Sequence, residues 1–140
     1  MFWDTSALIP LVLPEPRSAA LTETLAADRE VTLWWGTPVE CLSATYRRHR
    51  ESPLPAPLLT AALSRLRALV EDADTVAPTD DVRRRAGRLV AAHPLRAADA
   101  LQLAAALVWC EEQSAGEAFV CLDERLREAA RREGFSLLPE

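Results

Sequence analysis

The chain has 140 residues, of which 49% are apolar and 26% charged, and its formal net charge is −5. This balance is typical of one globular domain with a single core, and no apolar run reaches the roughly 20 residues that a membrane span needs. All 16 basic residues are arginine, which excludes P-loop ATPases and Schiff-base enzymes because both need a lysine.

The three cysteines are scattered, at Cys41, Cys110 and Cys121. They form no CxxC pair and no Cys/His metal spacing, and their apolar surroundings predict buried thiols. His49 and His93 are isolated, which favours roles at helix ends or in solvent. Because the first apolar segment begins at Met1, with no signal peptide before it, we expect a cytoplasmic protein without membrane contact.

Short apolar segments alternate with helical patterns along the chain. In chain order the predicted elements are a strand over residues 1–3, helices over 8–12 and 15–28, a strand over 31–35, helices over 37–50 and 58–70, a strand over 75–77, helices over 80–92 and 97–112, a strand over 118–122, a helix over 124–132 and a strand over 135–138. Thr37 and Thr79 are the predicted N-caps of their helices, and Pro10 interrupts the first helix. The alternation predicts an α/β fold, a parallel sheet with helices on both faces, in one domain over residues 1–140.

Four acids fall at equivalent places in this pattern. Asp4 ends the first strand and Asp123 ends the fourth. Glu40 lies in the first turn of the helix after the second strand, and Asp99 in the first turn of the long apolar helix. Because the carboxyl ends of parallel strands lie at one rim of a sheet, we expect these side chains to meet there, with Ser6 close enough to hydrogen-bond Asp4.

Carboxylates that gather against their mutual repulsion most often bind Mg²⁺ or Mn²⁺ through oxygen. Such a site can orient a phosphodiester and activate water. Each acid alone has a simpler interpretation. Asp4 or Ser6 caps the next helix, Asp99 and Asp123 stabilise their helices through the dipole, and Glu40 is solvated. The joint position of the four supports the metal site.

Two basic runs are candidates for contact with the phosphates of RNA. The densest comprises Arg83, Arg84, Arg85 and Arg88, and the next lies at residues 47–50. A protein with a negative net charge must concentrate its positive charge locally to bind nucleic acid. The alternative is that both runs are solvated helix faces.

These motifs together resemble the PIN-domain ribonucleases, and within them the VapC-like toxins of bacterial toxin–antitoxin pairs. The resemblance covers essentially the whole chain. It rests on DTSAL at residues 4–8, Glu40 after Thr37 and Pro38, LRAADAL at residues 95–101, and DERL at residues 123–126 followed by Gly134.

The resemblance implies a three-layer α/β/α fold with a five-stranded parallel sheet in the order 3-2-1-4-5. It implies hydrolysis of RNA that depends on Mg²⁺ or Mn²⁺, with an acidic quartet at Asp4, Glu40, Asp99 and Asp123 and a supporting hydroxyl at Ser6. It also implies a homodimer and inhibition by a cognate antitoxin, whose C-terminal segment occupies a groove near the site.

The chain departs from the family pattern at Cys121, where threonine is frequent, and at Gln102, where histidine is common. Both departures concern the positioning of substrate. Other functions remain open: a PIN-like nuclease for DNA or for RNA processing without a toxin role, and a catalytically silent PIN scaffold that binds a partner. A signalling receiver domain needs a lysine at its fifth strand, and this chain has none.

Overall fold

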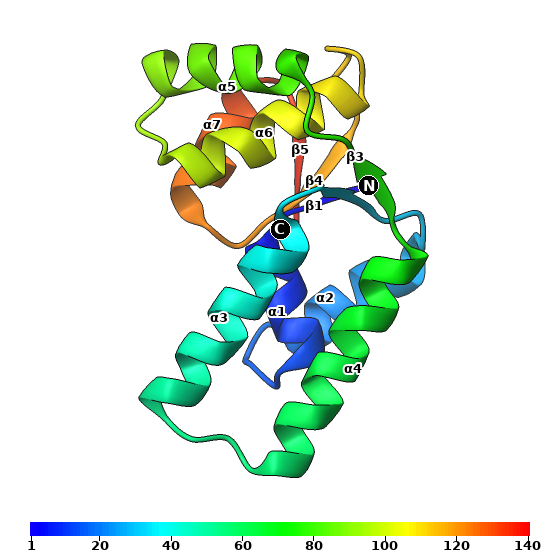
Figure 1. Ribbon diagram of the computed structural model, residues 1–140. Helices are drawn as coiled ribbons and strands as arrows, with labels where there is room; N and C mark the ends of the chain where they lie inside the picture. Colours follow the sequence, from blue (N-terminus) through cyan, green and yellow to red (C-terminus); the bar gives the residue numbers. More distant parts are fainter.

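A computed structural model describes residues 1–140 (Figure 1). Its core is one five-stranded parallel sheet in the order β3-β2-β1-β4-β5, as the resemblance implied. The strands are short: β1 (Phe2–Trp3), β2 (Thr32–Trp34), β3 (Asp74–Val76), β4 (Ala118–Val120) and β5 (Ser136–Leu138). Because β1 lies in the middle, the residue that follows it emerges at the centre of the sheet's carboxyl rim.

Seven helices cover the two faces of this sheet. They are α1 (Thr5–Val12), α2 (Ser18–Ala27), α3 (Thr37–Glu51), α4 (Ala56–Asp72), α5 (Asp80–Ala92), α6 (Ala97–Trp109) and α7 (Glu124–Arg132). Helices α5, α6 and α7 pack on one face and α1 to α4 on the other, so that the fold has three layers. Helices α3 and α4 form a long pair that extends beyond the edge of the sheet (Figure 1).

The two residues of β1 pack into the hydrophobic cores on opposite faces of the sheet. Successive side chains of a strand point to opposite faces. Phe2 accordingly joins the core under α5–α7, where its ring stacks on Phe119 with the centroids 5.5 Å apart, and Trp3 joins the core under α1–α4. Both side chains are fully buried, and this burial holds the strand that presents Asp4.

Several element boundaries differ from those predicted. Helix α1 begins at Thr5 instead of residue 8 and contains Pro10, because the burial of Leu8 and Val12 outweighs one missing backbone hydrogen bond. Thr37 does not cap α3, since Gly36 holds that position and the Thr37 side chain is buried.

Bounds of three further helices and one strand also differ from the prediction. Helix α2 begins at Ser18 instead of residue 15, and α4 begins at Ala56 instead of residue 58. Helix α6 ends at Trp109 instead of residue 112, because Glu111 and Glu112 have φ values of 51° and 65°, a left-handed conformation that ends a helix. The third strand spans residues 74–76, one residue earlier than predicted.

The cysteines are free thiols, but only two of the three are buried. Burial raises the pKa of the Cys41 thiol to about 12 and raises that of Cys121 further. Cys110 is half-buried, contrary to the prediction, because it lies at the C-cap of α6 near the surface. The structure contains no helix that combines the length and the hydropathy required to cross a bilayer.

Candidate active site

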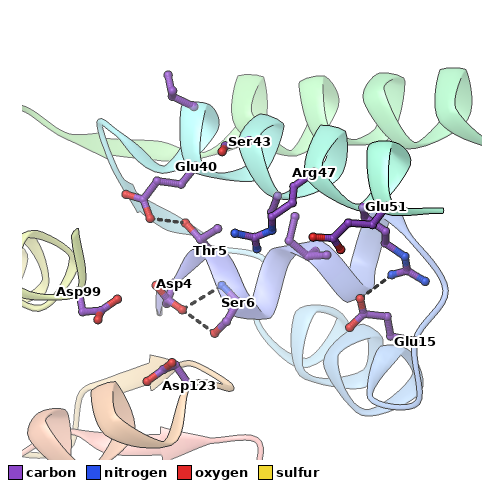
Figure 2. Close-up of a pocket in the computed structure, with 14 residues that line it drawn as sticks. Asp4, Thr5, Ser6, Glu15, Glu40, Ser43, Arg47, Glu51, Asp99 and Asp123 are labelled. Carbon is purple, nitrogen blue, oxygen red and sulfur yellow. Dashed lines mark hydrogen bonds and ion pairs between the residues drawn. The ribbon is translucent and has the colours of Figure 1, made fainter. Parts of the chain in front are cut away.

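An open pocket of about 880 Å³ lies at the carboxyl rim of the sheet and continues along α3. All four predicted acids line it: Asp4, Glu40, Asp99 and Asp123 (Figure 2). They come from the end of β1, from α3, from α6 and from the end of β4, so the fold brings together residues that are far apart in the sequence.

Asp4 is the most deeply placed of the four, with only 5% of its surface exposed. It is the N-cap of α1, and its Oδ2 accepts hydrogen bonds from the Ser6 backbone N–H at 2.9 Å and from the Ser6 hydroxyl. The Ser6 hydroxyl in turn accepts from the Leu122 N–H at 2.8 Å, which ties it to the end of β4. Burial raises the pKa of the Asp4 carboxyl; hydrogen bonds from Ser6 and Cys121 oppose this shift, and the charge of Asp99 adds to it.

Glu40 lies in the first turn of α3 and is half-buried. Its Oε2 accepts a hydrogen bond from the Thr5 hydroxyl at 3.1 Å. Burial raises the pKa of this carboxyl and the charges of Asp4 and Asp99 raise it further, while hydrogen bonds from Gln102 and Thr5 lower it. Glu40 is therefore part of one electrostatic group with the other acids.

Asp99 and Asp123 both stand at helix N-termini. Asp99 accepts a hydrogen bond from the Arg96 backbone N–H at 3.3 Å, and burial followed by the charge of Asp123 raises its pKa. Asp123 is the N-cap of α7, and its Oδ1 accepts from two backbone N–H groups, at 3.0 Å and 2.9 Å. Both residues therefore stabilise a helix N-terminus and also line the pocket.

The chemistry of the donor set fits a hard divalent cation. All four groups are carboxylates, and oxygen is the ligand that Mg²⁺ and Mn²⁺ prefer. As the side chains stand, no group of three or more His, Cys, Asp or Glu residues has the spacing of an assembled metal site. Rotation of the aspartate and glutamate side chains must bring the oxygens closer before they can share one ion.

The predicted basic run lies elsewhere, on the outer face of α5. Each of its members has an acidic partner: Arg83 with Asp80, Arg84 with Asp81, Arg85 with Asp81 and Glu112, and Arg88 with Glu133. None of these arginines lines the pocket. The structure therefore favours the solvated helix face for this run.

Two arginines of the other basic run do line the pocket. Arg48 forms an ion pair with Glu15 at 2.6 Å, whereas Arg47 has no ion-pair partner. Figure 2 shows Arg47 between Thr5 and Glu51. The lining residues of α3 are Val39, Glu40, Ser43, Ala44, Arg47, Arg48 and Glu51. Their spacing of three and four residues marks one helix face, a signal that could have identified Arg47 from the sequence.

Comparison with known families decides the family of this chain. The sequence profile of the PIN domain family matches residues 1–132. The chain belongs to the PIN domain family. No curated protein matches it significantly. PIN domains are generally metal-dependent nucleases, and this PIN domain carries four carboxylates in one open pocket at the sheet rim.

Proposed function

We propose that this PIN domain is an endoribonuclease that depends on Mg²⁺ or Mn²⁺ and acts in the cytoplasm as the toxin of a toxin–antitoxin pair. The observation that carries the nuclease proposal is the single pocket lined by Asp4, Glu40, Asp99 and Asp123. The matched family supports the metal and the nucleic-acid substrate. The toxin role rests on the resemblance of the sequence motifs.

In this proposal Asp4 and Asp99 hold the first ion, and Glu40 and Asp123 act through waters or a second ion. A bound divalent ion supplies charge stabilisation and an activated water for in-line displacement at phosphorus. Ser6 fixes the Asp4 carboxylate in one rotamer through two hydrogen bonds. Asp123 lines the pocket, and its second carboxylate oxygen takes no part in the helix cap.

Arg47 is the side chain best placed to bind a substrate phosphate. It lines the pocket and forms no ion pair, while the ion-paired arginines of α5 lie outside. Arg96 and Arg125 lie close enough to Asp99 to lower its pKa against the effect of burial. Arg47 in the pocket, together with Arg96 and Arg125 near Asp99, offsets the repulsion between RNA and a protein of net charge −5.

The proposal is tested by Asp4→Asn and Asp99→Asn. Each variant is expected to lose cleavage of RNA in the presence of Mn²⁺ while its circular dichroism spectrum stays that of the wild type. Asp80→Asn is the matched control, because Asp80 is an exposed acid of α5 outside the pocket. Cleavage at the wild-type rate by Asp4→Asn would refute the metal-site proposal, and cleavage of DNA alone would favour a different substrate.

The partners proposed from the resemblance, an antitoxin and a second copy, find support in an exposed apolar stripe. Trp35, Val39, Leu42 and Tyr46 are 59%, 67%, 39% and 41% exposed, respectively. Leu42 and Tyr46 also line an apolar groove of about 370 Å³ between α3 and α4. Val39 borders the acidic pocket, so that a segment bound along α3 can reach the carboxylates.

The toxin role has its own test. Expression of the wild type, but not of Asp4→Asn, is expected to arrest growth, and the product of a neighbouring short reading frame is expected to relieve the arrest. Leu42→Glu is expected to prevent that relief, and size-exclusion chromatography of the same variant shows whether a second copy uses the stripe. Growth unaffected by the active enzyme would favour an RNA-processing nuclease, and an inactive wild type would favour a PIN scaffold.

A further inference from the structure

Gln102 is a buried polar side chain in the middle of the apolar helix α6. It has 1% exposure, and its neighbours on α6, Leu103 and Ala104, are fully buried. Burial of an amide is unfavourable unless hydrogen bonds replace those it makes with water. The partners of Gln102 therefore show what holds it there.

Those partners lie on two other helices and lead to the active site. Gln102 Nε2 is 3.0 Å from Thr5 Oγ1 on α1 and 3.1 Å from Thr37 Oγ1 on α3. Its distance to Glu40 Oε2 is longer, at 3.4 Å. The Thr5 hydroxyl is 3.1 Å from the same Glu40 oxygen.

The number of protons that each group carries decides which group donates in each of these hydrogen bonds. The carboxylate of Glu40 can only accept, so Thr5 donates its single hydroxyl proton to Glu40. Thr5 Oγ1 must then accept from the Gln102 amide, whose second N–H is left for Thr37. Gln102 thus reaches Glu40 mainly through Thr5, in a relay, because the longer direct contact with Glu40 Oε2 at 3.4 Å must share one of the same two N–H groups.

We propose that Gln102 is a positioning residue that fixes the Glu40 carboxylate toward the pocket through the Thr5 hydroxyl. The inference rests on the proposed function, in which Glu40 takes part in ion binding. Glutamate has three rotatable side-chain bonds, and Glu40 caps no helix that would restrain it. The relay restrains it before the ion arrives, so that less rotamer freedom is lost on binding.

The test measures Mn²⁺ affinity by titration calorimetry on the full chain. Gln102→Leu removes both amide donors at similar volume, and Thr5→Val removes the intermediate hydroxyl. Each is expected to weaken Mn²⁺ binding by about 10- to 100-fold, the usual loss when an outer partner of a metal ligand is removed. Thr5→Ser keeps the hydroxyl and is expected to bind Mn²⁺ as the wild type does.

Thr45→Val is the matched control. Thr45 lies on the same helix as Glu40 and is as buried as Gln102, but its hydroxyl has no hydrogen-bond partner. Its removal is expected to leave Mn²⁺ affinity unchanged. A loss of affinity in Thr45→Val as large as that in Gln102→Leu would assign the effect to general packing and overturn the proposal.

The double variant Thr5→Val/Gln102→Leu separates a relay from two independent contacts. Steps in series fail together, so the double variant is expected to bind Mn²⁺ no more weakly than the weaker single variant. Losses that multiply would overturn the relay. A lower melting temperature with unchanged Mn²⁺ affinity in both single variants would show a purely structural role.

Failure of the relay and failure of the proposed function give different results. If the wild type binds Mn²⁺ and both single variants bind it equally well, only the relay is refuted. If the wild type itself does not bind Mn²⁺, the proposed function fails and the relay fails with it.

Discussion

Replacement of Asp4 by asparagine is expected to stabilise the metal-free protein while it removes activity. Asp4 is 5% exposed, and burial raises its pKa even though Ser6 donates two hydrogen bonds to it. A raised pKa means that the folded state favours the neutral carboxyl. At neutral pH the ionised group therefore lowers the free energy of unfolding, an effect that grows as the pH rises above the pKa of the unfolded chain.

Asparagine removes this charge and keeps the cap. Its side-chain oxygen can still accept from the Ser6 backbone, and asparagine and aspartate are about equally good N-caps. Substitutions that remove a functional strain of this kind commonly add about 0.5–2 kcal/mol to the free energy of unfolding. For a chain of this size each kcal/mol shifts the melting temperature by about 4 °C, so that we expect a rise of about 2–8 °C in EDTA.

Mn²⁺ should reverse the order of the two proteins. At a concentration 100 times the dissociation constant, a ligand stabilises the folded state by about 2.7 kcal/mol, or about 11 °C on the same scale. Differential scanning calorimetry of the wild type and Asp4→Asn, in EDTA and in millimolar Mn²⁺, measures both effects, and Asp80→Asn should behave as the wild type. An Asp4→Asn protein that melts well below a wild type indifferent to Mn²⁺ would show that Asp4 is only a helix cap.

Two further predictions concern charge. Arg47→Ala is expected to raise the KM for RNA several-fold and to flatten the dependence of KM on salt, because one phosphate contact is lost. Arg84→Ala should change neither quantity. Steady-state cleavage at several salt concentrations measures both, and the reverse result would assign substrate binding to α5. Burial raises the pKa of Glu133, but hydrogen bonds from His93 and from an arginine of α5 outweigh it and lower the pKa overall. The stability that Glu133 contributes is therefore present above its unfolded pKa and is lost as the pH falls through the folded value. Glu133→Gln should melt a few degrees below the wild type at pH 7, and the gap should close as the pH falls through the lowered pKa of Glu133. A gap independent of pH would contradict the ion pair.

The sequence predicts the fold and the meeting of the acids well because both follow from local rules. Two apolar residues before Asp4 predict a strand, and the common rim of parallel strands predicts that Asp4 and Asp123 approach each other. The sequence does not predict contacts between segments that are far apart in the chain. Thr37 looks like an N-cap, but its hydroxyl turns inward to Gln102, 65 residues away. Arg85 looks available for a ligand, but it pairs with Glu112 across 27 residues.

The four acids differ in what orients their side chains, and this difference decides which orientations can be predicted from the sequence. The three aspartates stand at helix N-termini, where short side chains accept hydrogen bonds from backbone N–H groups two or three residues away. Their orientation is thus encoded locally. Glu40 has a longer side chain and no cap to form, so its orientation depends on Thr5 and, beyond it, on Gln102 from another helix. A glutamate in a pocket formed by helix caps requires such a tertiary partner, and only the folded chain shows which residue provides it.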